Sequence, residues 1–210
     1  ASDVPLLIPE VNSDHADLVL VQRNRRGWKG SIVTNCNCTA TGVTLSLKPL
    51  LDGFGLKRVF LTSMQALSGA GYPGMAAIDL IDNIVPFIDG EEQKMQSEPL
   101  KMLGDFDGEQ VIQADFGISA QCNRVPVSDG HIVCVKVELG QAASLEQVSK
   151  SFSSFVPNEL VRGLPSSPSE SIKVFSEQDR PQPRLDRQNG DGMTTMVGRV
   201  IADSMLHVRY

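Results

Sequence analysis

HIVCVKVEL, residues 131–139, alternates between the two faces of an extended chain. One face of such a strand carries one histidine and four apolar side chains: His131, Val133, Val135, Val137 and Leu139. Successive side chains of a strand point in opposite directions, so this pattern predicts a strand with one face in a core. Alternation also predicts strands over 58–66 and 110–121, with shorter ones at 171–176 and 194–201. The long strand at 110–121 should turn the following residues to one side: Ile112, Ala114, Phe116 and Ile118.

Helical spacing of apolar residues occurs between these strands. The clearest helix follows Cys38 and shares one face among Val43, Leu47, Leu50, Leu51 and Phe54. Gly53 and Gly55 should close it, and Pro49 should bend it or end it early. Further helices are predicted over 91–103, over 144–155 with a capping box at Ser144 and Gln147, and over 76–85. The last should turn four side chains inward: Ala77, Leu80, Ile81 and Ile84.

This order of elements predicts an α+β fold in one domain, residues 1–210. We expect a mixed β-sheet with helices on one face. If the other face is also apolar, a partner subunit must bury it, so that face is available for dimerisation.

Composition limits the classes of function. The 210 residues are 41% hydrophobic and 21% charged, with a net charge of −6, which offers no basic surface for nucleic acid or acidic lipid. No apolar run approaches the roughly 20 residues that span a bilayer, and residues 1–4 do not resemble a signal peptide. We therefore expect a cytoplasmic protein that binds neither membrane nor nucleic acid. The four cysteines lack the spacing of a zinc site, and no metal is predicted.

The segment Asn35-Cys36-Asn37-Cys38-Thr39 joins a predicted strand to the start of the predicted helix. A thiol at that point lies near unpaired backbone N–H groups and the positive end of the helix dipole. Both favour the nucleophilic thiolate. Cys38 is the better candidate because it is closer to the helix. Cys36 remains an alternative, and so does a small buried cysteine without chemistry.

Two further segments carry candidate polar residues. Gln65 ends a predicted strand before Ser68-Gly69-Ala70-Gly71, where an amide could face a cleft and the backbone could approach a ligand. These glycines lack the strand and helix spacing of a Rossmann fingerprint. Arg124 and His131 flank the turn at 129–130, which would let the flanking strands pair and bring both side chains to one end of the sheet. Arginine suits a carboxylate, and histidine can move protons near pH 7, although a core histidine is the commoner case.

Glu91 and Lys94 are three residues apart and therefore share one face of a predicted helix. They could form a surface ion pair worth ~0.3 kcal/mol. They could instead recognise a zwitterionic or phosphorylated ligand.

Four motifs in order resemble the catalytic half of the aspartate-semialdehyde dehydrogenases. They are Asn-Cys-Thr at 37–39, Gln-Ala-x-Ser-Gly-Ala-Gly at 65–71, Glu-Glu-x-Lys at 91–94, and the Arg and His of 124 and 131. The spacings of 27 residues from Cys38 to Gln65 and 7 from Arg124 to His131 agree with the family's pattern. Tyr72-Pro73-Gly74 is similar to the fungal and archaeal branch. The resemblance runs from Val4-Pro5 to Val197-Gly198-Arg199.

The resemblance implies a role for each matching residue. Cys38 would form a thioacyl intermediate, His131 would be the acid/base, and Gln65 would orient the intermediate. The substrate α-carboxylate would be bound by Arg124 and its amino group by Glu91. Phosphate would be held by Lys94 and Asn37, and the cofactor would be contacted by Ser68 and Gly69.

The reaction implied is the NADP-dependent conversion of aspartyl 4-phosphate to aspartate 4-semialdehyde in lysine, threonine and methionine biosynthesis. The implied fold is the C-terminal domain of the glyceraldehyde-3-phosphate-dehydrogenase type, in a homodimer or homotetramer. We expect the family's N-terminal Rossmann domain and last helix to be missing, so that this chain alone binds no NADP and is inactive. Two alternatives stay open: a dimerisation module without catalysis, and a related acyl reductase such as malonyl-CoA reductase.

Overall fold

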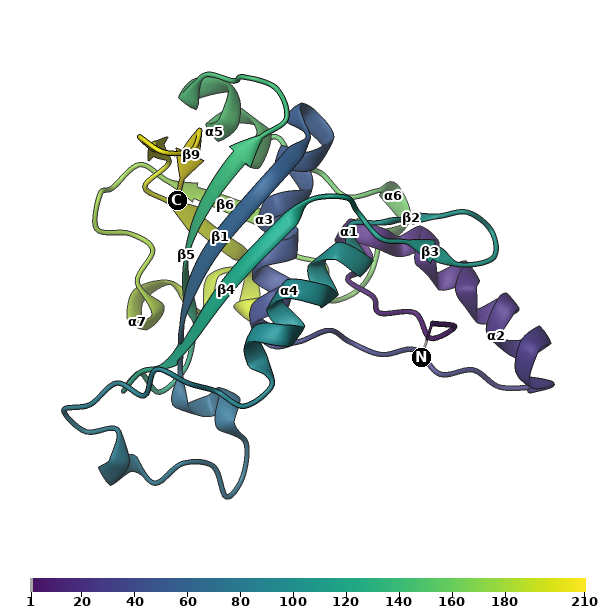
Figure 1. The fold of residues 1–210 in the computed structure, drawn as a ribbon, viewed down its shortest axis with the longest axis horizontal. Helices are drawn as coiled ribbons and strands as arrows, with labels where there is room; N and C mark the ends of the chain where they lie inside the picture. The colour runs from purple at the N-terminus through teal and green to yellow at the C-terminus, as the bar shows by residue number, and fades with distance from the viewer. Residues whose placement is uncertain (1) are drawn as a thin grey trace.

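The central element of the fold is a five-stranded mixed sheet (Figure 1). The computed structural model describes residues 2–210, apart from the side chain of Ala77. The strands lie in the order β4 (Gly117–Arg124), β1 (Leu56–Gln65), β5 (Ile132–Leu139), β9 (Val208–Arg209) and β8 (Ile201–Ala202). β1 runs parallel to β4 and antiparallel to β5. Two small sheets pair β2 (Asp105–Phe106) with β3 (Val111–Ile112), and β6 (Ile172–Phe175) with β7 (Thr195–Gly198).

Most of the helices are short. The longer ones are α2 (Leu18–Arg26), α3 (Cys38–Phe54), α4 (Glu91–Met102) and α5 (Leu145–Ser153). Single turns are α1 (Pro9–Asn12), α6 (Glu159–Arg162), α7 (Pro183–Asp186) and the 3-10 turns η1 (Ser13–Asp17), η2 (Leu67–Ala70), η3 (Ala77–Asp79) and η4 (Asn189–Gly192). In Figure 1, α3 lies behind the sheet, and α2 projects away from it. Within residues 2–210, none of these helices is long and apolar enough to cross a bilayer.

The core lies between the sheet and the helices on one of its faces. Its members include Val59 and Leu61 of β1, Val135, Val137 and Leu139 of β5, Leu47 and Leu50 of α3, and Met95 and Met102 of α4. The alternation over 131–139 is confirmed, because the odd-numbered side chains from Val135 onward are buried and Cys134 and Lys136 are exposed. This confirms the predicted α+β fold.

The opposite face of the sheet is open and mixed in character. Phe60 is 43% exposed there and is flanked by Ser119 on β4 and Lys136 on β5. Thr62 follows two residues later, between exposed neighbours on the same strands. The predicted dimerisation face required the second face of the sheet to be apolar, and this face is apolar only in part.

Two predicted helices agree closely with the structure. α3 begins at Cys38 and continues past Pro49 to Phe54, so the proline does not end it early. α5 has the predicted capping box, in which Ser144 and Gln147 exchange side-chain to backbone hydrogen bonds.

The prediction of a helix over 76–85 is wrong. Only the single 3-10 turn η3 forms there, and Leu80 is buried while Ile81 and Ile84 are 65% and 59% exposed. The predicted inward position of Ala77 lies outside the described side chains. Four apolar residues at helical spacing cannot hold a helix without a surface to bury them, since packing supplies most helical stability.

The single strand predicted over 110–121 is divided. β3 ends at Ile112, which is 55% exposed, and β4 starts at Gly117. The chain passes between these strands from the small β2–β3 sheet to the central sheet, and on the way Ala114 donates its backbone N–H to the carbonyl of Leu100. The alternation continues through this break and therefore conceals it.

The expected pairing of the two strands around the turn at 129–130 is also wrong. β4 and β5 are not neighbours, because β1 lies between them. The link from β4 to β5 passes over the end of β1, where Val125 donates its N–H to the carbonyl of Gln65. Arg124 and His131 still reach the same end of the sheet, as predicted, and the end of β1 lies between them.

Candidate active site

Cys38 is the first residue of α3, and its side chain is exposed. Asn37 caps the helix, since its Oδ1 accepts the N–H groups of Thr39 and Ala40 at 2.9 and 3.1 Å. The Sγ of Cys38 lies 3.3 Å from Nε2 of His131. A thiol thus meets an imidazole at the positive end of a 17-residue helix.

His131 is oriented by the main chain at the end of β1. Its Nδ1 accepts the backbone N–H of Ala66 at 3.0 Å. A ring nitrogen that accepts cannot carry a proton, so the proton of the neutral imidazole is on Nε2, which faces the sulfur of Cys38. Burial lowers the pKa of His131, and the charge of Arg124 lowers it further, while Glu91 opposes them. The ring is therefore kept neutral and donates toward the sulfur.

Cys36, the alternative nucleophile, has a different environment. Its Sγ lies 2.9 Å from Oγ1 of Thr41 and is partly buried. Burial raises the pKa of the Cys36 thiol, and the carboxylate of Glu98 raises it further, although the hydrogen bond between Cys36 and Thr41 opposes this. A protonated thiol is a poor nucleophile. The geometry favours Cys38.

Gln65, Asn37 and Glu91 form one buried network. The Nε2 of Gln65 donates to Oε1 of Glu91 at 2.6 Å and to Oγ of Ser63 at 3.2 Å. The Nδ2 of Asn37 lies 2.9 and 3.0 Å from the two carboxylate oxygens of Glu91. Gln65 and Glu91 are only 2% and 6% exposed. Glu91 therefore joins the cap of α3 to the end of β1, a contact that the sequence does not predict.

Arg124 is buried beside this network. It is 4% exposed, and its Nη1 donates to the carbonyl of Ala66 at 2.6 Å. Gly69 lies over it: a Cβ built at Gly69 would be 2.9 Å from Nη1 of Arg124 and 3.1 Å from Cε1 of His131. A side chain at position 69 would therefore require Arg124, His131 or the η2 turn to shift.

The remaining predicted residues lie at the edge of this cluster. Lys94 is exposed one turn after Glu91 on α4, and Glu91 directs its oxygens inward, away from a surface pairing. Ser68 is exposed in η2, next to Gly69. Residues 69–74 have the letters G-x-G-x-x-G, but they follow β1 into η2 and a loop, where a Rossmann fingerprint would open a helix.

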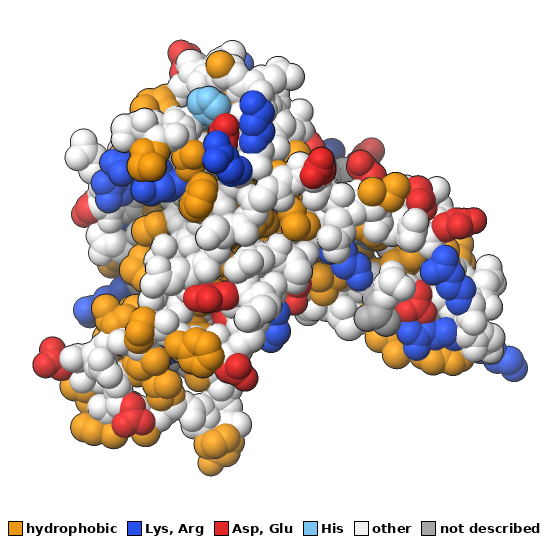
Figure 2. All heavy atoms as spheres, in the orientation of Figure 1, with side chains coloured by type: hydrophobic (Ala, Val, Ile, Leu, Met, Phe, Trp, Pro, Cys, Tyr) orange, Lys and Arg blue, Asp and Glu red, His pale blue; other side chains and the backbone are white. Residues whose placement is uncertain are grey.

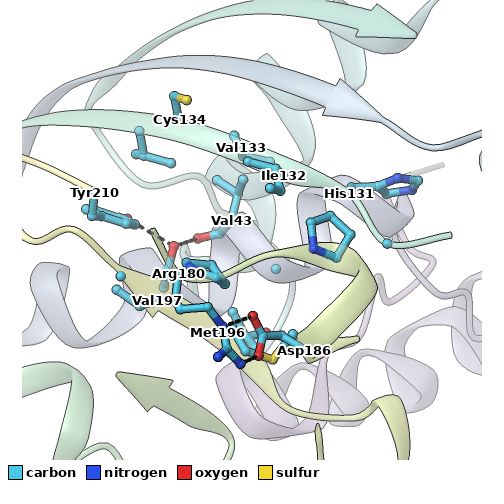
Figure 3. Close-up of a pocket in the computed structure, with 18 of the residues that line it drawn as sticks. Val43, His131, Ile132, Val133, Cys134, Arg180, Asp186, Met196, Val197 and Tyr210 are labelled. Atoms are coloured by element: carbon cyan, nitrogen blue, oxygen red, sulfur yellow. Dashed lines mark hydrogen bonds and ion pairs between the residues drawn. The ribbon is translucent and has the colours of Figure 1, made fainter. Parts of the chain in front are cut away.

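A cavity of about 950 Å³ extends from Cys38 and His131 along β5. Figure 3 shows Val133 and Tyr210 on one wall and the Arg180–Asp186 ion pair on the other. The second wall includes the polar loop after β6. In the part of the chain that the structure describes, no three side chains of the metal-binding types gather as a metal site.

Comparison with known proteins agrees with this fold. The family described as semialdehyde dehydrogenase, dimerisation domain, matches residues 47–209. This chain belongs to that family. It is similar to the aspartate-semialdehyde dehydrogenase of Archaeoglobus fulgidus, with 51% identity over 210 residues, and to that of Schizosaccharomyces pombe, with 43% over 216 residues. These alignments cover 100% and 99% of this chain and 60% of each relative, so the chain spans about 60% of their length.

A solved structure gives the same result. The crystal structure of aspartate-semialdehyde dehydrogenase with NADP from Candida albicans superposes with a TM-score of 0.88 at 37% identity. The superposition covers 99% of this chain and 61% of the Candida albicans chain. The predicted resemblance to this family is confirmed.

One contributor to the site has no sequence signal. The N–H of Ala66 fixes the tautomer of His131, yet any residue except proline would supply it. Its position becomes visible only when β1 is known to lie between β4 and β5.

Proposed function

We propose that the protein containing this chain converts L-aspartyl 4-phosphate to L-aspartate 4-semialdehyde with NADP as cofactor. This is a step of lysine, threonine and methionine biosynthesis, and we expect it in the cytoplasm. The observation that carries the proposal is the 3.3 Å approach of the Cys38 sulfur to Nε2 of His131 at the start of α3. Residues 1–210 are proposed as the catalytic and dimerisation domain, inactive without the rest of the protein.

The chemistry of Cys38 and His131 begins with attack of the thiolate on the acyl carbon of the substrate. A carbon–sulfur bond forms, the carbon–oxygen bond to phosphate breaks, and phosphate leaves with that electron pair. The Cys38 thiol releases its proton to solvent, and the Nε2–H of His131, which faces the sulfur, stabilises the resulting thiolate before attack. When the reduced product leaves, the carbon–sulfur bond breaks and the electron pair returns to the sulfur.

Substrate recognition is assigned to the buried cluster. Arg124 uses one N–H on the carbonyl of Ala66, which leaves donors of its planar fork for the α-carboxylate. Glu91 is proposed to bind the amino group, and its carboxylate also accepts hydrogen bonds from Gln65 and Asn37. The exposed Lys94 on the same helix is proposed to meet phosphate, together with Asn37.

NADP is proposed to bind against the η2 turn. NADPH supplies the reducing equivalents when bound. Gly69 brings the backbone of this turn directly over Arg124 and His131, and Ser68 is exposed beside it. This close backbone approach fits a cofactor that must reach the acyl group on Cys38, so Ser68 and Gly69 would contact it.

A homodimer is proposed through the open face of the sheet and the adjoining loop 71–90. Figure 2 shows a cluster of apolar side chains at the lower left, where this loop lies in Figure 1. Its members include Tyr72, Ile78, Ile81, Ile84 and Phe87, each at least 59% exposed. A patch of this kind on a folded protein commonly marks an interface. Sedimentation of Ile81→Asp, with Met205→Asp as an exposed control elsewhere, tests this assignment.

Mass spectrometry of acyl adducts tests the proposed reaction on the chain itself. The protein is incubated with aspartyl 4-phosphate, made in situ by a kinase, and the peptide carrying Cys38 is analysed. An adduct on Cys38 that is lost in Cys38→Ser is expected. An adduct on Cys36, or from malonyl-CoA only, would overturn the assignment. A folded dimer that forms no adduct would favour the dimerisation module.

A further inference from the structure

The turn that carries His131 is anchored on one side by backbone hydrogen bonds. Leu67 and Ser68 donate their N–H groups to the carbonyls of Val127 and Ser128 at 2.8 and 3.0 Å. These bonds tie the turn to η2, directly after the end of β1. They do not restrain the side of the turn that faces away from β1, toward the wall of the cavity.

Arg187 and α7 hold that second side. The Nη1 of Arg187 lies 3.2 Å from Oγ of Ser128 and 3.3 Å from the carbonyl oxygen of Asp129. Gly130, at φ +87°, packs against α7: an added Cβ would lie 3.1 Å from Cβ of Pro183. The residue before His131 thus packs against α7.

Asp186 keeps α7 in place. Its carboxylate is fully buried and accepts the N–H of Gln182 at 2.6 Å and Nε of Arg180 at 2.8 Å, with a second bond from the same guanidinium. That guanidinium stacks 4.8 Å from the ring centre of Phe175 in β6. Figure 3 shows the Arg180–Asp186 pair on the cavity wall that faces β5. A four-residue helix has little stability of its own, so this pair supports its position.

We propose that Arg187 is a positioning residue for His131. It holds the turn at 128–130 so that the imidazole reaches Cys38 while Nδ1 still accepts from Ala66. The contacts of the imidazole with Cys38 and with Ala66 both depend on where the main chain places His131. A small displacement of a catalytic group lowers the reaction rate strongly. The inference rests on the proposed function of Cys38 and His131 and adds a residue to it.

The charged groups around His131 do not replace this role. Arg124 approaches from β4, Glu91 from α4 and Cys38 from α3, and none of them contacts the turn at 128–130 in the bonds described above. The charge of Arg187 is partly balanced by Asp129, whose Oδ2 is 4.0 Å away. Arg187→Lys keeps a positive charge at this position but loses the planar fork, so it separates an effect of charge from an effect of geometry.

Alkylation of Cys38 by iodoacetamide measures the position of the imidazole. The variants are Arg187→Ala and Arg187→Lys, with Arg184→Ala as a matched control, since Arg184 is exposed on the same helix. At about pH 7 the rate for Arg187→Ala should fall about fivefold, with a smaller change at about pH 10, where alkylation depends less on the imidazole. Arg187→Lys should recover part of the rate, and Arg184→Ala should match the unmodified protein.

Several outcomes separate this inference from the proposed function. An unchanged rate for Arg187→Ala at both pH values would refute the positioning role alone. If Cys38 of the unmodified protein reacts no faster than the exposed Cys134, the proposed function fails instead. Labelling of the buried Cys122 reports unfolding. Should Arg187→Ala unfold, Arg187→Lys decides: a reduced rate at neutral pH supports the role, and an unchanged rate contradicts it.

Discussion

The cluster at the end of β1, with Gln65 and Glu91, and the loop at 71–90 adjoin in the sequence. They differ in whether their side chains find partners within the chain. At the first, polar groups are buried and paired, with Gln65 and Glu91 almost fully enclosed. In the second, Ile78 and Phe87 are 75% and 62% exposed. Burial of a polar group costs free energy unless a partner is present, whereas exposed apolar groups are tolerated until a partner covers them. The first region thus pairs its polar groups within the chain, whereas the second leaves its apolar side chains exposed.

The largest difference should appear when the network loses its common acceptor. Glu91→Ala removes the carboxylate that accepts from Gln65 and Asn37 and leaves the buried Gln65 amide with only Ser63 as acceptor, so the free energy of unfolding should fall by about 2–4 kcal/mol. Urea denaturation measures it. Glu91→Gln keeps an acceptor oxygen and should lose less. A loss below about 1 kcal/mol for the alanine variant would mean that the hydrogen bonds to Glu91 contribute little to stability.

Gly69 tests whether the close packing of the site is needed for its chemistry. Gly69→Ala places a methyl group against Arg124 and His131 and should slow alkylation of Cys38 about tenfold at neutral pH, because the imidazole is displaced. Gly30→Ala is the control, since a Cβ there meets nothing within 4 Å. Equal rates for both variants would show that the η2 turn simply moves aside.

The pH dependence of stability sharpens the comparison further. The pKa of His131 is lowered from 6.5 in the folded protein, chiefly by burial, so the folded state binds fewer protons than the unfolded state. Stability should therefore fall as the pH drops below 6.5, toward the lowered value. His131→Gln should flatten this part of the curve, as urea denaturation at several pH values would reveal. A curve unchanged by the substitution would assign the effect to other groups.

The smallest effect is expected in the loop. Ile81→Ser removes an apolar side chain that is 65% exposed, so unfolding of the dilute monomer should change by less than about 0.5 kcal/mol. Alkylation of Cys38 should not change. A loss above about 1 kcal/mol would show that the isolated chain already buries this residue.

The elements that the sequence predicts correctly carry local information. The alternation in 131–139 and the capping box at Ser144 depend on neighbours within a few residues, and both are present. The position of Cys38 at the start of α3 follows from the same kind of signal. The order of the strands does not, because pairing of β1 between β4 and β5 joins residues far apart in the chain.

The failed predictions have the same cause. The apolar spacing of 76–85 is helical, but within the described residues no surface covers Ile81 and Ile84. For the site, sequence brings Arg124 and His131 to one end of the sheet, yet it assigns Glu91 only to a ligand or the surface. The contacts of Glu91 with Asn37 and Gln65 span 54 and 26 residues, which no local pattern reports.

The separation of β4 from β5 by β1 has a consequence for folding. The seven residues between these two strands would permit an early hairpin that excludes β1, and such a hairpin must open before the native sheet forms. The Cys38–His131 contact spans 93 residues and can arise only afterwards. Contacts of this range form late and slowly. A refolding chain should therefore regain its secondary structure, seen by circular dichroism, before Cys38 regains its reactivity. The rate of alkylation then reports when the last step of folding is complete.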